Sequence, residues 1–347
     1  MQWPWKRASS QDQLLVSWCG QALAYVEAVS VAGRFRVQRM GVVQQDQDKP
    51  KEFAHRLREM GLAGHPALVM LATEQSMLLQ IAAPAVPPEE LRSAARYQIR
   101  DMVDQHIDDL TLDVLHLGDG QDKSAGQLFV VAAANTVIRE AMQLAEAMEW
   151  TVRVIDVQEM AQRNLQSAWA KAAGFADRAT AALVVVNDKQ ALLTISAKEE
   201  LYYSRRLDLP AGFMAMQWDG SAEVTQEPVD AYTPVGEYVP DYGNPSGLAA
   251  DDGSLGGNDP AQRFLVELQR SIDLWDRTWT ALPMASVAVH AGARSTELAL
   301  WLSRGLGQAV QALEPAALFD GVPELSQEDA IKCLPLLGLL LRSGGAS

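Results

Sequence analysis

The residue types that most often carry catalytic chemistry do not form a recognised catalytic or metal-binding pattern in this chain. No phosphate-binding loop of the form G-x-x-x-x-G-K-[ST] and no G-x-S-x-G nucleophile elbow occurs. The five histidines never share a metal-ligand spacing with one another or with a cysteine. They are His55, His65, His106, His116 and His290. Motifs therefore give no direct support for an enzyme.

Paired acids and cysteines are the other reactive groups. The pairs Asp108-Asp109, Glu199-Glu200 and Asp251-Asp252 fall in predicted loops and turns, where solvated carboxylates are the rule. Cys19 and Cys333 lie far apart, each in an apolar run. This usage is typical of buried thiols in a reducing compartment.

The elements that would position any site include a stretch used twice, Leu14–Met40 and Leu183–Leu207. Aligning Gln21 with Gln190 gives an offset of 190 − 21 = 169 residues, close to half of the 347-residue chain. Each copy has an apolar run, a polar break, a second β-rich run, a turn and a third strand. The sequence therefore predicts a three-stranded antiparallel meander at the head of each half. A repeat of this length indicates a duplicated domain, with a cleft between related halves.

Alternating strands and helices follow the meanders, which predicts a mixed α/β fold. The predicted helices are Lys51–Met60, Glu89–Val103, Asn135–Met148, Val157–Ala173, Ala261–Trp279 and Glu297–Gly305. The predicted strands outside the meanders are Ala67–Ala72, Met77–Ile81, Thr111–Leu117, Leu128–Ala134, Val152–Ile155 and Ser286–His290. Asn135 is expected to cap its helix, and Ser326 with Asp329 to cap the closing apolar run.

The domain boundaries follow from these patterns. Residues 1–12 are expected to form a flexible tail, 13–178 a first half with an inserted αβ subdomain, and 179–347 a second half. No Lys or Arg occurs between Arg206 and Arg263, while Pro, Gly and acids accumulate, which predicts an acidic disordered loop at 217–260. In the tail, Trp3 and Trp5 precede Lys6-Arg7. These side chains either contact a bilayer or a partner, or belong to an untethered terminus.

Composition excludes several classes of partner. The net charge is 29 − 44 = −15, with a pI near 4.8, which opposes binding to nucleic acid or to an anionic membrane. No stretch reaches the roughly 18 apolar residues of a membrane span, and the N-terminus lacks the apolar core of a signal peptide. We therefore expect a cytoplasmic protein.

A family resemblance rests on the order of several stretches rather than on one motif. They are APAVPPEELRSAARYQIRDMV, DDLTLDVLHLGD, FVVAAANTVIREAMQLAEAMEWTVRVIDVQEMA, FLVELQRSIDLW and VAVHAGARSTELALWLSRGLG. Taken together, they resemble the PilM-like type IV pilus assembly proteins of the actin-like class, and within them the MSHA pilus biogenesis (MshI) branch. This resemblance implies duplicated ribonuclease-H-like, actin-like domains around a central nucleotide cleft.

The resemblance also implies where the nucleotide cleft lies and that it is degenerate. Nucleotide-binding members carry Asp-x-Gly at the first turn of each meander, where amides hold phosphates and the Asp organises magnesium. Here the first turn reads Trp18-Cys19-Gly20 and the second Asn187-Asp188-Lys189. The implied cleft residues are Gly20, Gln21, Asn187, Asp188, Lys189, Ala291, Gly292 and Ala293, with no catalytic residue and no metal ligand. No cofactor is expected, with ATP and magnesium as the alternative.

Lys189 has two readings. Its ammonium group either occupies the phosphate position and locks the cleft without ATP, or lies on a solvated hairpin tip.

The function implied by the resemblance is that of an adaptor at the inner face of the bacterial inner membrane. Family members bind the cytoplasmic N-terminal tail of a bitopic pilus assembly protein, and through it dock to the pilus motor. The segment Pro84–Val103 is a candidate for part of the tail-binding surface, against the alternative that its apolar residues are core. An actin-like ATPase and the cytoplasmic domain of a type II secretion platform protein are the competing hypotheses.

Overall fold

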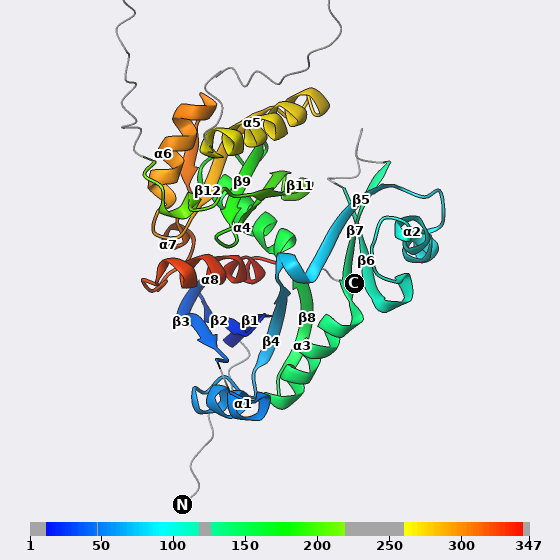
Figure 1. Ribbon diagram of the computed structural model, residues 1–347, viewed down its shortest axis with the longest axis vertical. Coiled ribbons are helices and arrows are strands. Elements are labelled where there is room, and N and C mark those ends of the chain that lie inside the picture. Colours follow the sequence, from blue (N-terminus) through cyan, green and yellow to red (C-terminus); the bar gives the residue numbers. More distant parts are fainter. Residues whose placement is uncertain (1–11, 47, 118–125, 219–259, 343–347) are drawn as a thin grey trace, which may run out of the picture.

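The computed structural model describes residues 12–46, 48–117, 126–218 and 260–342. Two five-stranded sheets with the same topology dominate it (Figure 1). The first sheet has the order β3-β2-β1-β4-β8, with β1 (Asp12–Cys19), β2 (Ala22–Val31), β3 (Arg34–Gln44), β4 (Pro66–Leu71) and β8 (Thr151–Val157). The second has the order β11-β10-β9-β12-β13, with β9 (Ala179–Val185), β10 (Gln190–Ala197), β11 (Glu200–Asp208), β12 (Met284–His290) and β13 (Val310–Ala312).

Strand directions also match between the two sheets. Strands β1, β2 and β3 form an antiparallel meander, and β4 and β8 extend it in parallel with β1. Strands β9, β10, β11, β12 and β13 repeat this pattern. The predicted duplicated meander and mixed α/β class are therefore confirmed. Every residue of β9 is buried, as expected of a strand covered on both faces.

The two meanders differ at their first turn. Leu23 pairs with Trp18 in the first hairpin, whereas Leu192, which is 192 − 23 = 169 residues later, pairs with Val184. Cys19 pairs directly with Ala22, so that turn consists of Gly20 and Gln21 alone. The offset of 169 residues therefore holds after the turn and not before it, because the second turn is longer by three residues. The predicted match of Cys19 with Asp188 is wrong for this reason.

Two helices fill the space between the sheets, and each covers the sheet of the other half (Figure 1). Helix α4 (Gln158–Ala172) follows the first sheet but packs mainly on β9 and β10. Helix α8 (Gln327–Leu340) follows the second sheet but packs on β1, β2 and β3. The helices cross at Gly338, where a Cβ would lie 2.0 Å from the carbonyl oxygen of Ala161. Only glycine permits this approach.

The α4 interface with the second sheet is polar. Gln166 receives a hydrogen bond from Thr194 at 2.7 Å and one from Ser196 at 3.2 Å. Gln162 donates to the carbonyl oxygens of Ala182 and Leu192, both at 3.0 Å. Because these groups are buried and bonded, they fix the position of α4 on its sheet.

The outer faces carry the remaining helices. Helices α1 (Pro50–Glu59) and α3 (Asn135–Ala147) cover the first sheet, and α5 (Pro260–Thr278) and α6 (Ser295–Leu306) cover the second (Figure 1). Phe264, Leu268, Ile272 and Trp275 of α5 are buried, as the predicted stripe requires. The short helix α7 (Pro315–Leu318) precedes α8. Ser326 Oγ accepts the Asp329 amide at 3.2 Å, which confirms the predicted cap of α8.

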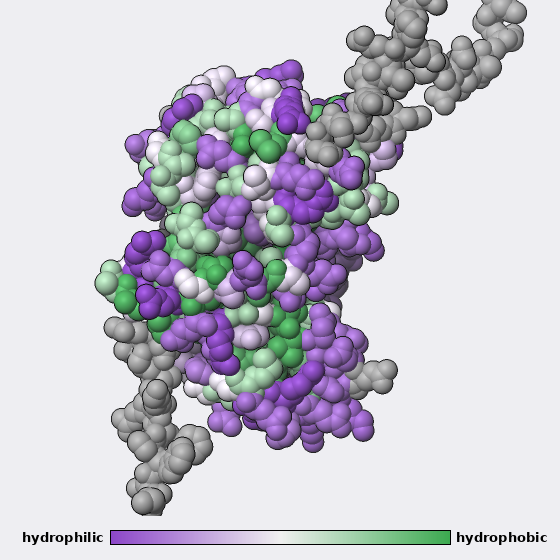
Figure 2. Space-filling view, turned by 90° about the vertical axis from the view of Figure 1, so that its left-hand side faces the viewer, coloured by the Kyte–Doolittle hydropathy of each residue, from purple (hydrophilic) through white to green (hydrophobic). Residues whose placement is uncertain are grey.

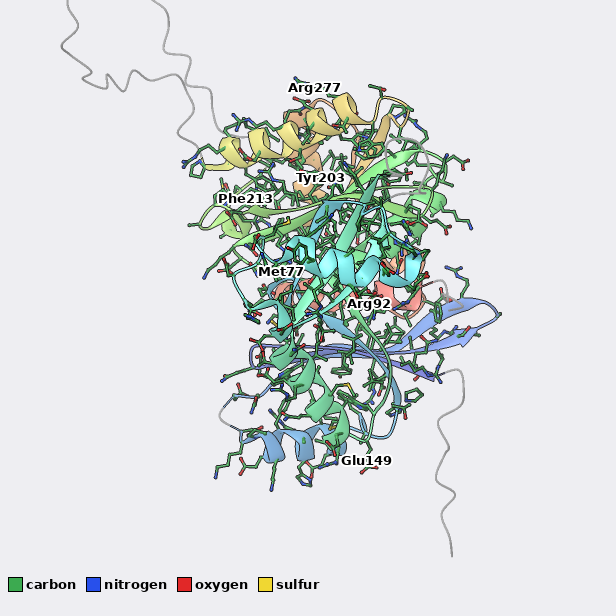
Figure 3. All side chains as sticks on the ribbon, turned by 90° about the vertical axis from the view of Figure 1, so that its right-hand side faces the viewer. Met77, Arg92, Glu149, Tyr203, Phe213 and Arg277 are labelled. Atoms are coloured by element: carbon green, nitrogen blue, oxygen red, sulfur yellow. The ribbon has the colours of Figure 1, made fainter. Side chains whose placement is uncertain are left out.

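A third, antiparallel sheet stands beside the two halves. Its order is β5-β7-β6, with β5 (Ser76–Ala82), β6 (Leu110–His116) and β7 (Gln127–Ala134). Helix α2 (Leu91–Ile99) covers one face, and Figure 3 shows this helix, with Arg92 labelled, on the side toward the viewer. Leu117 and Phe129 join the core of the second half from the other face. The insertion therefore contacts both halves.

Two predictions for this region are wrong. The helix expected at Glu89–Val103 is shorter, because Pro88–Glu90 form a 3-10 turn and α2 ends at Ile99. Asn135 is the first residue of α3 and makes no capping bond. Its amide instead accepts from Thr111 Oγ1 at 2.7 Å and donates to the carbonyl oxygen of Asp108 at 3.0 Å, which ties α3 to the start of β6. Residues 219–259 of the acidic loop predicted at 217–260 lie outside the described residues, whereas its two edges are wrong, because Trp218 is buried and Pro260 begins α5.

Candidate functional site

A cavity of about 320 Å³ lies between the two halves, where the first turn of one meander faces that of the other. The β1–β2 turn, the segment after β4, the start of α4, the β9–β10 turn and one side of α8 enclose it. Its lining residues are Ser17, Cys19, Gln21, Ala22, Ala24, Met70, Ala72, Glu74, Gln158, Val186, Asn187, Ile331, Lys332 and Pro335. We call this space the central cavity.

A hydrogen bond joins the two halves at the central cavity. Asn187 Nδ2 donates to Glu74 Oε1 at 2.8 Å. The side-chain oxygen of Asn187, Oδ1, accepts hydrogen bonds from the backbone amides of Lys189 and Gln190, both at 2.9 Å. One neutral amide thus stabilises the long turn and binds a carboxylate across the cleft. An aspartate here would keep the turn bonds but lose the Nδ2 donor to Glu74 Oε1, and of the donors to Glu74 among the described residues the Cys19 thiol, at 4.0 Å from Oε2, would remain.

Two opposite charges lie near the thiol of Cys19. Burial raises the Cys19 pKa, the Glu74 carboxylate raises it further, and the Lys332 ammonium lowers it. Lys332 comes from α8 and forms no ion pair within 4.0 Å with any described carboxylate. The lysine predicted for the cleft, as one of two alternatives, was Lys189. Lys189 is exposed and does not line the central cavity, whereas Lys332 does.

The floor of the central cavity includes Gln158, the first residue of α4. Its side chain is 3% exposed. No hydrogen bond from it is found within residues 12–46, 48–117, 126–218 and 260–342, so its amide is available to a ligand in the cavity. The sequence did not predict that Gln158 lines the cavity, because this position depends on how α4 packs against the sheet of the other half.

Helix α8 divides the predicted cleft. Ile331, Lys332 and Pro335 face the central cavity, while Ala330, Leu334 and Leu337 face a second hollow of about 420 Å³. Gly292 and Ala293 line this second hollow and not the central cavity. The predicted cleft residues are therefore split between two sides of one helix.

The turn Ala291-Gly292-Ala293 is already filled by a side chain of the same protein. Gln327 accepts the Ala293 amide at 2.8 Å and donates to the carbonyl oxygen of Ala291. Gly292 has φ +59°, and a Cβ there would lie 2.7 Å from Gln327 Oε1. Gln327 thus binds the backbone groups of the turn that a ligand would otherwise reach.

His290, just before this turn, is a buried neutral imidazole. Burial lowers its pKa to about 4, although hydrogen bonding to the carbonyl oxygens of Leu313 and Ala330 acts in the opposite direction. Nδ1 lies 3.1 Å from the Leu313 carbonyl oxygen, so this nitrogen carries the proton. His290 therefore ties β12 to the chain after β13.

The predicted site residues thus occupy different positions. Gln21 and Asn187 line the central cavity. Gly20 forms the tight β1–β2 turn with φ +63°, and Asp188 and Lys189 are exposed on the opposite turn. Ala291 is buried. In the described part of the chain, no three His, Cys, Asp or Glu side chains come together as a metal site would require.

Magnesium and a triphosphate do not suit these groups. Mg²⁺ takes oxygen ligands, commonly one or two carboxylates together with phosphates. Glu74 is the one carboxylate among the described residues that line the central cavity, and Asn187 already binds it. It would also repel a polyphosphate that approached Lys332.

A second polar contact crosses between the halves. Arg206 of β11 donates to the carbonyl oxygen of Ser76 at 2.7 Å and to Glu159 Oε1 at 3.2 Å. Glu159 is 2% exposed; burial raises its pKa, and the Arg206 charge lowers it. The Arg206–Ser76 bond and the Asn187–Glu74 bond fasten the second sheet to the end of the link after β4 and to the first residue of β5.

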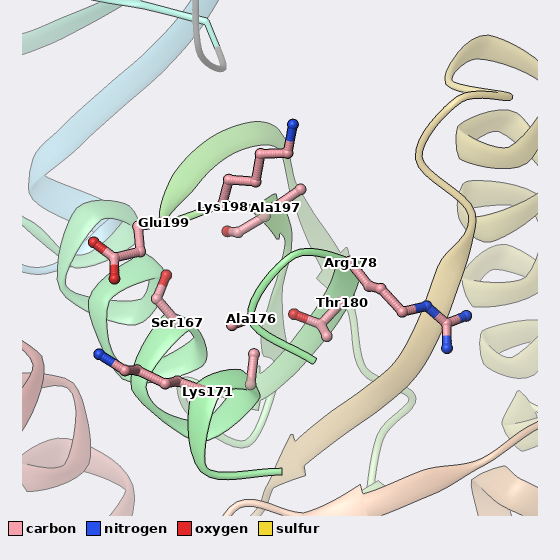
Figure 4. Close-up of a pocket in the computed structure, with 10 residues that line it drawn as sticks. Ser167, Lys171, Ala176, Arg178, Thr180, Ala197, Lys198 and Glu199 are labelled. Carbon is pink, nitrogen blue, oxygen red and sulfur yellow. The ribbon is translucent and has the colours of Figure 1, made fainter. Parts of the chain in front are cut away.

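A further small pocket lies at the far end of α4 (Figure 4). Its volume of about 30 Å³ suits a single water molecule. Lys171, Arg178 and Lys198 surround it, but their side chains point in different directions (Figure 4). We do not regard it as a ligand site.

Comparisons with known proteins bear on the fold. No protein-family model and no curated protein sequence matches the chain. The PilM-PilN type IV pilus biogenesis complex contains a chain that matches with a TM-score of 0.62 and 18% identity, over 95% of this chain and 98% of that one. The cytoplasmic domain of EpsL, an inner membrane component of the type II secretion system of Vibrio cholerae, matches with a TM-score of 0.41 and 17% identity, over 57% and 71%.

A third solved structure is a Bacteroides thetaiotaomicron protein with an actin-like ATPase fold and unknown function. It matches with a TM-score of 0.48 and 9% identity, over 96% of this chain and 97% of that one. The match to the PilM-PilN complex, with its TM-score of 0.62, shows that the chain has a PilM-like fold. None of the helices in the described residues is long and apolar enough to cross a bilayer.

Proposed function

We propose that this protein is an actin-like adaptor of an MSHA-type type IV pilus assembly system. It binds the cytoplasmic tail of an inner-membrane assembly protein and acts at the inner face of the inner membrane. The observation that carries the proposal is that neither meander turn contributes a carboxylate to the central cavity. An actin-like fold whose meander turns contribute no carboxylate for nucleotide hydrolysis can still serve as a two-part scaffold that binds a partner.

The outer face of α2 and the residues after it are proposed as part of the tail-binding surface. Ala95 and Ile99 point inward and are fully buried, whereas Tyr97 is 72% and Met102 51% exposed. Arg100 lies over the Tyr97 ring at 5.2 Å, which holds the ring in place. The same stretch of chain carries the exposed acids Glu89, Glu90, Asp101, Asp104 and Asp108, of which Asp101 forms an ion pair with Arg100 at 3.2 Å. An apolar tail with the basic residues typical of cytoplasmic flanks suits this surface.

The test is a pull-down with synthetic N-terminal tails of pilus inner-membrane assembly proteins. We expect one tail to bind the wild type, and the double change Tyr97→Ala and Met102→Ala to weaken binding at least about tenfold, as for two exposed anchor residues. The matched control is Val266→Ala with Leu274→Ala, which removes two comparably exposed side chains from α5. Failure of every tail would contradict the adaptor function. Binding that survives the α2 changes would contradict the surface.

An actin-like ATPase is the competing function, and the volume of the central cavity is the observation in its favour. Gln158 and Lys332 offer an amide and a cation to an anionic ligand there. Magnesium-dependent release of phosphate from ATP, lost on changing Gln158→Ala but not Lys189→Ala, would establish it.

A further inference from the structure

The hollow beside α8 forms an apolar groove that no helix or strand of the described residues covers. Met40 of β3, Leu334 and Leu337 of α8 form its buried floor. Val322 and Leu325 form one wall and remain partly exposed. Figure 2 shows the side of the molecule on which α7 lies in Figure 1, and hydrophobic residues gather there between the upper and lower parts of the molecule. Its volume of about 420 Å³ is enough for large side chains. We call it the α8 groove.

Acidic side chains mark the edge of the α8 groove. Glu314 and Glu324 line it and are exposed. Neither forms an ion pair with a cation of the described residues. An occupant with apolar side chains followed by positive charge would satisfy both the floor and the edge.

The chain itself carries such a sequence at its N-terminus, Met1-Gln2-Trp3-Pro4-Trp5-Lys6-Arg7. In an extended segment, residues two apart project from the same side, so Trp3 and Trp5 can enter one groove together. Pro4 favours an extended conformation for Trp3. Each indole can bury about 150–250 Å². Lys6 and Arg7 follow directly in the sequence, and their positive charges complement the carboxylates at the edge of the groove.

The attachment point of this segment is close enough to the α8 groove. Asp12 pairs with Val29, Val29 with Arg36, and Arg36 with Asp320, so these residues form one row across the sheet. At about 4.8 Å per strand, Asp12 lies about 14 Å from Asp320. Val322 begins the wall of the groove two residues later. Residues 1–11, when extended, span up to about 36 Å.

We propose that the α8 groove is the docking site of the protein's own N-terminal segment, with Trp3 and Trp5 on the apolar floor and Lys6 and Arg7 at Glu314 and Glu324.

The first test uses the full chain and hydrogen exchange. We expect the double change Trp3→Ala and Trp5→Ala to raise amide exchange in residues 320–330 at least about fivefold, because the segment no longer covers them. The control Trp279→Phe alters an indole elsewhere and should leave this region unchanged. Equal exchange in the wild type and the double variant would overturn the proposal.

The second test measures binding of a labelled peptide, residues 1–11, to a chain that starts at Asp12, where β1 begins. We expect saturable binding, and at least about tenfold weaker binding to the full chain, because the tethered segment competes at high effective concentration. Glu314→Lys with Glu324→Lys should weaken binding to the shortened chain, whereas the control Glu59→Lys with Glu146→Lys, at two exposed acids of α1 and α3, should not. No binding, or equal binding to both lengths, would overturn the proposal. A full chain that dimerises through its N-terminal segment would overturn docking within one molecule.

Discussion

Asn187 and Glu74 are 113 residues apart in the chain and are joined by a 2.8 Å hydrogen bond across the central cavity. Asn187 belongs to the β9–β10 turn of the second sheet, and Glu74 to the segment that leaves β4 of the first. The bond therefore connects the two halves of the protein at the central cavity.

We expect the change Asn187→Asp to destabilise the closed arrangement. The aspartate keeps the acceptor for the Lys189 and Gln190 amides but places a second carboxylate opposite Glu74. The expected loss in free energy of unfolding is about 1–2 kcal/mol, measured by urea denaturation at pH 7. Adding Glu74→Gln should restore a donor and recover most of the loss, whereas Glu59→Gln on α1 should not. An additive double-mutant cycle would contradict a direct interaction.

We expect the wild-type protein not to bind ATP with micromolar affinity. Glu74 repels polyphosphate, and no further carboxylate among the described lining residues supports magnesium. Lys189→Gly should leave the result unchanged, because Lys189 lies outside the central cavity. Titration calorimetry with ATP and magnesium measures this, and micromolar binding by the wild type would refute it.

Gly338→Ala should separate α4 from α8. The added Cβ would lie 2.0 Å from the Ala161 carbonyl oxygen, and neither backbone can yield without shifting a helix. We expect a loss of about 3 kcal/mol, at the upper end for overpacking, seen as a lower denaturation midpoint. Gly126→Ala is the matched control, since nothing lies within 4 Å of its Cβ, and it should change stability by less than about 0.5 kcal/mol.

His290 should make the fold sensitive to mild acid. Its pKa is about 4 in the folded protein against 6.5 for the free side chain, so the unfolded state binds a proton first as the pH falls. Stability is therefore present above pH 6.5 and is lost progressively toward pH 4. Between pH 7 and pH 5 the expected loss from this group is about 2 kcal/mol. His290→Asn should remove that part of the pH dependence; an unchanged difference between pH 7 and pH 5 would contradict it.

The two cysteines should differ in reactivity. Burial raises the pKa of Cys333 to about 12, and its thiol contacts the Gly41 carbonyl oxygen at 3.4 Å. Cys19 is partly exposed, although its pKa is also raised. We expect iodoacetamide at pH 8 to modify Cys19 slowly and Cys333 only after unfolding, because the thiolate is the reactive form. Mass spectrometry of Cys19→Ser should then find no modification of the folded protein.

The sequence by itself determined the elements and their repetition. Apolar periodicity and turn residues are local signals, so they predicted both meanders, the buried stripe of α5 and the cap of α8 at Ser326. The degenerate nucleotide cleft was implied by the family resemblance rather than by these local signals, and it stays a prediction. Some local predictions failed because groups distant in the sequence bind the side chain. Asn135 was predicted to cap its helix, but its side-chain amide is bonded to Thr111 and Asp108 instead.

Only the tertiary structure decided what those elements enclose. Helices α4 and α8 exchange sheets, which places Gln158 and Lys332 in the central cavity and splits the predicted cleft residues between two hollows. Periodicity says that a helix face is buried but not against which partner, because many apolar surfaces satisfy it equally. The partner is fixed by close contacts such as Gly338 on Ala161, and these depend on residues 338 − 161 = 177 positions apart.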